Sequence, residues 1–92
     1  MKKAIKVIVN GSVQGVFFRQ FVKDTADKLN IRGFVRNLEN GDVEIFAEGD
    51  NDNISFFLDK VKEGPKHAII KNLTIEEKKW SGEFKDFKIL HF

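Results

Sequence analysis

The sequence predicts an α+β sandwich in which two helices cover one face of an antiparallel sheet of four to five strands. Three observations carry this prediction. Short β-branched runs alternate apolar and polar residues, two longer segments repeat their apolar residues at helical spacing, and the segments follow the order β-α-β-β-α-β with a short extra strand. The 92 residues are 41% hydrophobic, so we expect one domain over residues 1–92 with one modest core.

The chain begins with a predicted strand and helix. Residues 4–10 are β-branched and alternating, which is typical of a strand, and they lead directly into a glycine-containing loop. Apolar residues recur at helical spacing over residues 18–29. Asn30 and Gly33 follow, and both residue types are common just beyond the end of a helix. The sequence therefore predicts a first helix that starts where the loop ends.

A hairpin is predicted next. Residues 34–38 and 43–47 have the composition of strands, and Asn40-Gly41 lies between them. Asn-Gly is a strong hairpin signal because both residues tolerate the positive φ angles that a tight turn requires. We therefore expect two antiparallel neighbours joined by a short turn.

The remaining segments complete the pattern. Apolar residues at helical spacing over residues 54–61 follow a run of candidate N-caps, and Gly64-Pro65 ends this second helix. Residues 69–75 are predicted to form a further strand, residues 80–82 a turn, and residues 84–92 a terminal strand. This order is that of a ferredoxin-like βαββαβ sandwich.

The predicted order also places two segments near one another. A right-handed crossover through the first helix leaves strands 4–10 and 34–38 parallel, with strand 43–47 between them. Their C-terminal ends then share one edge of the sheet, about 10 Å apart at two inter-strand spacings. We therefore expect Arg19, just after the loop, and Asn37, near the end of its strand, to face a common ligand.

The loop itself is the most informative segment. Residues 11–19 read Gly-Ser-Val-Gln-Gly-Val-Phe-Phe-Arg and join a strand to a helix that opens with an arginine. Backbone N–H groups in such a loop can converge on a phosphate, the helix N-terminus adds partial positive charge, and arginine adds a two-pronged charged donor. A glycine-punctuated turn alone is more often only a turn.

Composition excludes several classes of function. The chain has no cysteine, which rules out a disulfide framework and a cysteine nucleophile. Its net charge is only +2 with both signs interspersed, so nucleic acid is not an expected partner. No apolar run is long enough for a signal peptide or a membrane span, and we expect a cytoplasmic protein that is a monomer and has no membrane partner.

Two motifs give the chain a resemblance to the acylphosphatase family. Residues 11–19 are similar to the family pattern G-x-V-Q-G-V-x-F-R, and residues 33–37 with Asn40-Gly41 are similar to its second pattern, G-W/F-V-x-N followed by a hairpin glycine. The resemblance extends over nearly the whole chain. Phe17 stands where glycine or another aromatic residue is frequent, and Phe34 stands where tryptophan is usual.

The resemblance implies hydrolysis of acylphosphates to a carboxylate and inorganic phosphate, with no metal and no cofactor. Inorganic phosphate would bind as the product or as an inhibitor. By analogy, Arg19 would bind the phosphate and Asn37 would orient the attacking water. The backbone N–H groups that would help to bind the phosphate belong to Gln14, Gly15, Val16, Phe17 and Phe18. A carboxylate is a good leaving group, so no general acid is needed, and the substrate phosphate is a candidate proton acceptor.

Parts of the sequence also fit two other functions, RNA binding and phosphate binding without catalysis. Arg32-Gly33-Phe34 resembles the start of an RNA-recognition motif, but Val35 and Arg36 break that pattern. A non-catalytic phosphate-binding domain would need the loop and the arginine but not Asn37. We interpret Arg36 as a solvated charge on the strand face opposite Asn37, and His67 and His91 as surface or packing residues without a site role.

Overall fold

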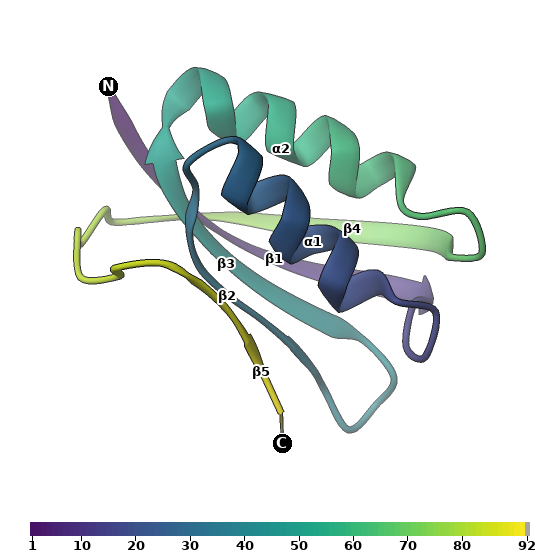
Figure 1. The fold of residues 1–92 in the computed structure, drawn as a ribbon. Helices are drawn as coiled ribbons and strands as arrows, with labels where there is room; N and C mark the ends of the chain where they lie inside the picture. The colour runs from purple at the N-terminus through teal and green to yellow at the C-terminus, as the bar shows by residue number, and fades with distance from the viewer. Residues whose placement is uncertain (92) are drawn as a thin grey trace.

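The computed structural model describes residues 1–91 and shows a five-stranded sheet with two helices on one face (Figure 1). All the predicted strands and helices are present. Several strands extend beyond the alternating apolar runs, because backbone pairing continues where burial ends. The elements are β1 (Lys2–Ser12), α1 (Phe18–Lys28), β2 (Arg32–Asn37), β3 (Val43–Asp50), α2 (Asn51–Glu63), β4 (Ile69–Lys78) and β5 (Phe87–Leu90).

The strand order places the ends of β1 and β2 at the same edge. The sheet runs β4-β1-β3-β2-β5, and β3 is antiparallel to both of its neighbours, as predicted. Val43 of β3 is paired with Val9 on one side and with Asn37 on the other. Asn37 is therefore level with Val9, near the C-terminal end of β1. It lies two strands away from the loop that follows β1.

The fifth strand corrects the prediction of an antiparallel sheet. β5 pairs with β2 in parallel, which makes the sheet mixed. The chain leaves β4 at one edge of the sheet, passes along the end that lies away from the β1–α1 loop, and enters β5 at the opposite edge (Figure 1). β5 must then run toward the loop, as β1 and β2 do. It is also shorter than the predicted 84–92, and residue 92 lies outside the described residues.

The connection to β5 is anchored by a buried carboxylate. Glu48 of β3 is 3% exposed, and its two oxygens accept hydrogen bonds from the backbone N–H groups of Ser81 and Gly82 and from the Ser81 hydroxyl. A buried carboxylate that accepts several hydrogen bonds fixes its donors strongly. Residues 80–82 have no regular turn, in contrast to the prediction, but their hydrogen bonds to Glu48 hold the connection in place before β5 begins.

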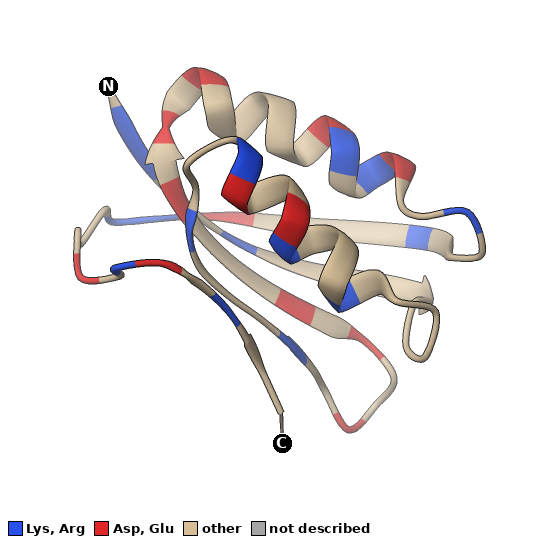
Figure 2. Cartoon of the chain, viewed as in Figure 1, with Lys and Arg blue, Asp and Glu red and all other residues tan. Residues whose placement is uncertain are grey.

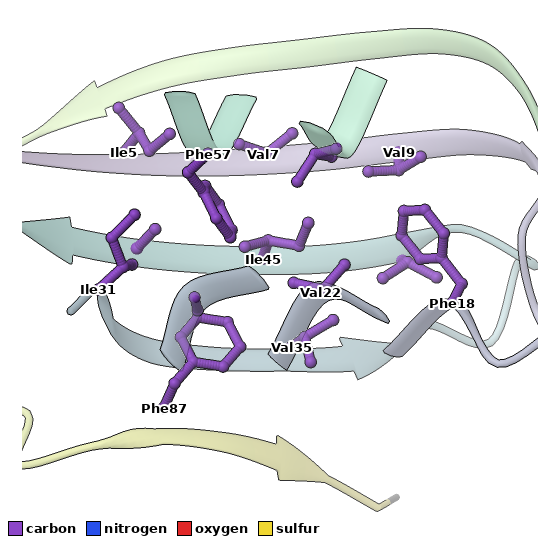
Figure 3. Packing of buried hydrophobic residues seen from close by; sticks show 14 of the residues in the cluster. Ile5, Val7, Val9, Phe18, Val22, Ile31, Val35, Ile45, Phe57 and Phe87 are labelled. Carbon is purple, nitrogen blue, oxygen red and sulfur yellow. The ribbon is translucent and has the colours of Figure 1, made fainter. Parts of the chain in front are cut away.

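The core lies between the sheet and the helices (Figure 3). Each helix contributes one buried stripe at helical spacing, as predicted. Phe18 is 1% exposed and packs against the end of the sheet next to the loop. Because Phe18 is held in the core, the start of α1 and the neighbouring Arg19 have a fixed position. The buried helix residues are Phe18, Val22 and Ala26 in α1 and Ile54, Phe57 and Val61 in α2.

The other face of the sheet carries a cross-strand ion network. Arg36 Nε lies 2.6 Å from Glu44 Oε1, and Lys6 Nζ lies 3.6 Å from Glu44 Oε2. Arg36 is therefore on the face opposite Asn37, as expected, but it is not simply solvated. The prediction missed this pairing because the partner is on the next strand, eight residues away in sequence.

Candidate active site

The segment between β1 and α1, residues 13–17, is here called the anion loop. It carries no charged residue, and the first turn of α1 has no acidic one (Figure 2). Gly15 has φ +76°, and a Cβ added there would meet nothing within 4 Å. The backbone conformation therefore favours glycine, and the space beside it is open. A loop of this kind at a helix N-terminus is suited to an anion.

Phe17, the last residue of the loop, has an unusual conformation. Its φ and ψ are 60° and 22°, in the left-handed region, and its side chain is 87% exposed. A bulky residue in this region costs about 1–3 kcal/mol. Its carbonyl accepts a hydrogen bond from Phe21 N at 3.0 Å, which starts the helix. The strain therefore belongs to the turn that leads the chain from the loop into α1.

Arg19 contacts the C-terminal segment of the chain. Its Nη1 lies 3.4 Å from the Leu90 carbonyl oxygen and 3.3 Å from His91 Nδ1. Arginine has only donors, so Nδ1 is the acceptor in this contact. Within residues 1–91 no ion pair joins Arg19 to a carboxylate. The guanidinium is therefore held by a backbone carbonyl and an imidazole rather than by a carboxylate of these residues.

The contact with His91 corrects the sequence interpretation. We expected His91 to be a surface or packing residue without a site role, but the parallel direction of β5 brings it beside Arg19. A contact across 72 residues leaves no periodic signal in the sequence. His67, in contrast, is exposed in the turn before β4.

A second cation of α1 also holds β5. Lys23, one turn after Arg19, donates to the Phe87 carbonyl at 3.2 Å and to Asp27 Oδ2 at 2.8 Å. The hydrogen bond with Asp27 is the main cause that raises the pKa of Lys23 above its usual value. Two side chains from one face of α1 thus bind backbone carbonyls of β5, and this links the helix to the strand that carries the acceptors of Arg19.

The anion loop is tied to the β2–β3 hairpin by Gln14. The Gln14 side-chain amide donates to the backbone oxygens of Leu38 and Asp42, each at 2.9 Å. These two residues close the hairpin, with Leu38 N bonded to Asp42 O at 2.8 Å. The sequence interpretation assigned only the backbone of Gln14 to the site. Its side chain fixes the loop beside the residue that follows Asn37.

Asn37 has a polar atom that the fold does not use. Its Oδ1 is shielded from solvent and accepts no hydrogen bond from any residue in the range 1–91. A buried acceptor without a partner costs about 1–3 kcal/mol, and such groups are rare in native folds. Asn37 is on the face of β2 that carries the buried Val35, the helix side of the sheet. Its Oδ1 is therefore a buried acceptor without a protein partner, at the end of β2 nearest the loop.

A shallow hollow of about 310 Å³ lies beside the loop. It is bounded on one side by the loop and the start of α1 and on the other by the end of β5. Of the predicted site residues, Gly15, Phe17, Phe18 and Arg19 contribute to its wall, whereas Gln14, Val16 and Asn37 do not. Asn37 is brought to the same edge of the sheet by the register of β2 and by Gln14. The lining residues are Val13, Gly15, Phe17, Phe18, Arg19, Gln20, Ile89 and His91.

Residues 1–91 contain neither a metal-binding cluster nor a membrane-spanning helix. No group of three or more His, Asp or Glu side chains in this part of the chain is arranged to hold a metal ion. Neither described helix is long and apolar enough to cross a membrane.

Comparison with known proteins assigns the family. The family model described as Acylphosphatase matches residues 5–89. The chain belongs to the acylphosphatase family. A protein named acylphosphatase from Syntrophus aciditrophicus is 43% identical to it over 91 residues, which are 99% of this chain and 95% of that protein.

Solved structures of acylphosphatases have the same fold. The enzyme from Bacillus subtilis superposes with a TM-score of 0.92 at 36% identity, over 98% of this chain and 99% of that one. An acylphosphatase from Coxiella burnetii gives 0.91 at 39% identity, over 97% and 93%. These matches confirm both the family resemblance and the ferredoxin-like fold expected from the sequence.

Proposed function

We propose that this member of the acylphosphatase family hydrolyses acylphosphates by direct attack of water on phosphorus. The attacking oxygen forms a bond to phosphorus, the bond between phosphorus and the acyl oxygen breaks, and a carboxylate and inorganic phosphate leave. Because the carboxylate is a stable leaving group, the protein must chiefly position the phosphate and stabilise charge on its equatorial oxygens.

Arg19 and the anion loop are assigned to the phosphate. The backbone N–H groups of residues 14–18 and the N-terminus of α1 supply partial positive charge, and the guanidinium supplies a full one. The observation that carries this assignment is that Arg19 is held by the Leu90 carbonyl and the His91 imidazole, and by no carboxylate of residues 1–91. An arginine fixed in this way loses little freedom on binding and has no carboxylate among residues 1–91 to release first.

Asn37 is assigned to the attacking water. A neutral amide is a poor base, but it can hold a water in line by accepting one of its hydrogen bonds. The buried Oδ1 without a partner supports this role, since a strand residue that served only the hairpin would have its amide satisfied by the hairpin. We assign the proton of the water to a phosphate oxygen of the substrate.

Hydrolysis of benzoyl phosphate in the presence of a chelator tests the proposal. We expect rapid turnover by the wild-type protein, and a loss on the order of 10²–10³-fold in Arg19→Ala, because it removes a preorganised charge-stabilising donor. Asn37→Ala is expected to lower kcat more than it raises KM. Circular dichroism and urea unfolding must show that both variants are folded.

The same experiment separates catalysis from binding. If the folded wild-type protein gives no turnover above buffer but binds inorganic phosphate in a way that Arg19→Ala abolishes, the site is a phosphate-binding site without hydrolysis. If Asn37→Ala retains full kcat, the role assigned to its amide is wrong even though the activity stands.

A further inference from the structure

Phe17 has a combination of properties that fold stability does not explain. It has a left-handed backbone conformation, and its ring is 87% exposed. Glycine would adopt this conformation without strain, and an exposed ring buries almost no surface in return. Strained residues that persist in a fold cluster at functional sites.

A second residue of the chain makes the contrast clear. Asn30 is the other non-glycine residue with positive φ within residues 1–91, at 54°. Asparagine tolerates this conformation, and Asn30 follows the C-terminal end of α1, where it is common. Phe17 has no such explanation, because aromatic residues have no preference for the left-handed region.

The position of the ring suggests what it contacts. Phe17 lines the hollow together with Arg19, and the opposite wall is formed by Ile89 and His91 of the C-terminal segment. The hollow is at the low end of the size range of small-molecule sites. A phosphate held by Arg19 and the loop would leave the rest of its molecule next to the aromatic ring.

We propose that Phe17 is the platform for the acyl group and that it selects acylphosphates with aromatic or bulky apolar acyl groups over those with small ones. This inference rests on the proposed function, which places the phosphate at Arg19. An aromatic acyl group would stack on the exposed ring and cover apolar surface of Phe17 and Ile89, whereas an acetyl group is too small to do either. The phosphate would supply affinity for all substrates, and Phe17 would supply the preference.

Substrate selectivity is the readout that tests the platform. We would measure kcat/KM for benzoyl phosphate and for acetyl phosphate in the wild-type protein, in Phe17→Gly and in Phe17→Tyr. The ratio of the two values is expected to fall about tenfold in Phe17→Gly, and to be retained in Phe17→Tyr, which keeps the ring. The matched control is Phe56→Ala, since Phe56 is an aromatic residue of α2 that is 59% exposed and does not line the hollow.

Binding measurements keep this test independent of turnover. Calorimetric dissociation constants for benzoylphosphonate and acetylphosphonate, which resist this hydrolysis, should show the same dependence on the ring at residue 17. If the wild-type protein shows no turnover but prefers benzoylphosphonate through Phe17, the proposed function fails and the platform stands. If Phe17→Gly changes both substrates and both phosphonates by the same factor, or changes neither, the platform is wrong.

Discussion

Arg19 and Arg36 lie at the same end of the sheet but on opposite sides of it, and they have opposite electrostatic surroundings. Arg36 is 2.6 Å from the Glu44 carboxylate, which also pairs with Lys6. Arg19 contacts a backbone carbonyl and an imidazole. One arginine has its charge compensated across strands, whereas the other is fixed in place without compensation by a carboxylate of residues 1–91. The difference separates an arginine that is paired within the sheet from the one that the proposed function assigns to an anionic ligand.

The largest effect expected from this comparison is that of Arg19→Lys. Lysine keeps the charge but loses the planar fork, so it cannot contact two phosphate oxygens and the acceptors of Leu90 and His91 in the same way. We expect kcat/KM for benzoyl phosphate to fall by about 10²-fold. Arg36→Lys is the matched control and should retain wild-type turnover. Equal losses in the two variants would remove the distinction between the two arginines.

Glu44→Gln tests the ion network that compensates the charge of Arg36. It removes the carboxylate that Arg36 and Lys6 share, and the glutamate side chain is only 11% exposed. We expect the free energy of unfolding in urea to fall by about 1–3 kcal/mol, because a charge-assisted hydrogen bond is lost from a partly buried position. Turnover should be unchanged. A loss of activity in the folded variant would show that the two faces are coupled.

His91→Asp would make the surroundings of Arg19 resemble those of Arg36. The new carboxylate would pair with the guanidinium, and the substrate phosphate would have to displace it. We expect KM for benzoyl phosphate and the inhibition constant of inorganic phosphate to rise about threefold to tenfold near neutral pH. His91→Asn, which can still accept from Arg19, is the control. If both variants behave alike, the added charge has no effect on the site.

Lys23→Met is expected to have the smallest effect. The contact of Lys23 with the Phe87 carbonyl helps to hold β5 against α1, and its loss should speed hydrogen exchange of β5 amides and lower turnover slightly. In the wild-type protein the pKa of Lys23 is raised by Asp27. The stabilisation that the charged Lys23 provides is therefore fully present below its unfolded-state pKa. It should be lost as the pH rises through the higher folded-state pKa. The difference in exchange between wild type and variant should therefore shrink at strongly alkaline pH.

Local patterns explain why much of the fold could be predicted. The helical stripes, the Asn40-Gly41 turn and the crossover rule were sufficient for the succession of helices and strands along the chain and for the placement of β3 between β1 and β2. The parallel pairing of β5 was missed because it depends on the path of the connection held by Glu48, which the alternation of residues does not encode.

The candidate site was predictable only in part. The loop and the arginine are contiguous in sequence, and Asn37 could be placed by the strand order. The acceptors of Arg19 on β5, the Gln14 side chain bonded to the hairpin, and the partner of Arg36 are contacts between separate elements, and no local pattern reports them. Whether Arg19 and Asn37 act as proposed depends on the kinetic experiments above.

The contacts of Arg19 with the C-terminal segment also affect the order in which the parts of the candidate site form during synthesis. Arg19 is separated from its acceptors by 71 and 72 residues, and β5 follows every other element in the chain. A nascent chain that has emerged as far as β4 already contains both helices, the anion loop and four of the strands, but no acceptor for the guanidinium. Long-range contacts of this kind tend to form late in folding. The arginine would therefore be oriented in one of the last steps, so that a stalled or truncated chain could be largely folded without a finished phosphate site.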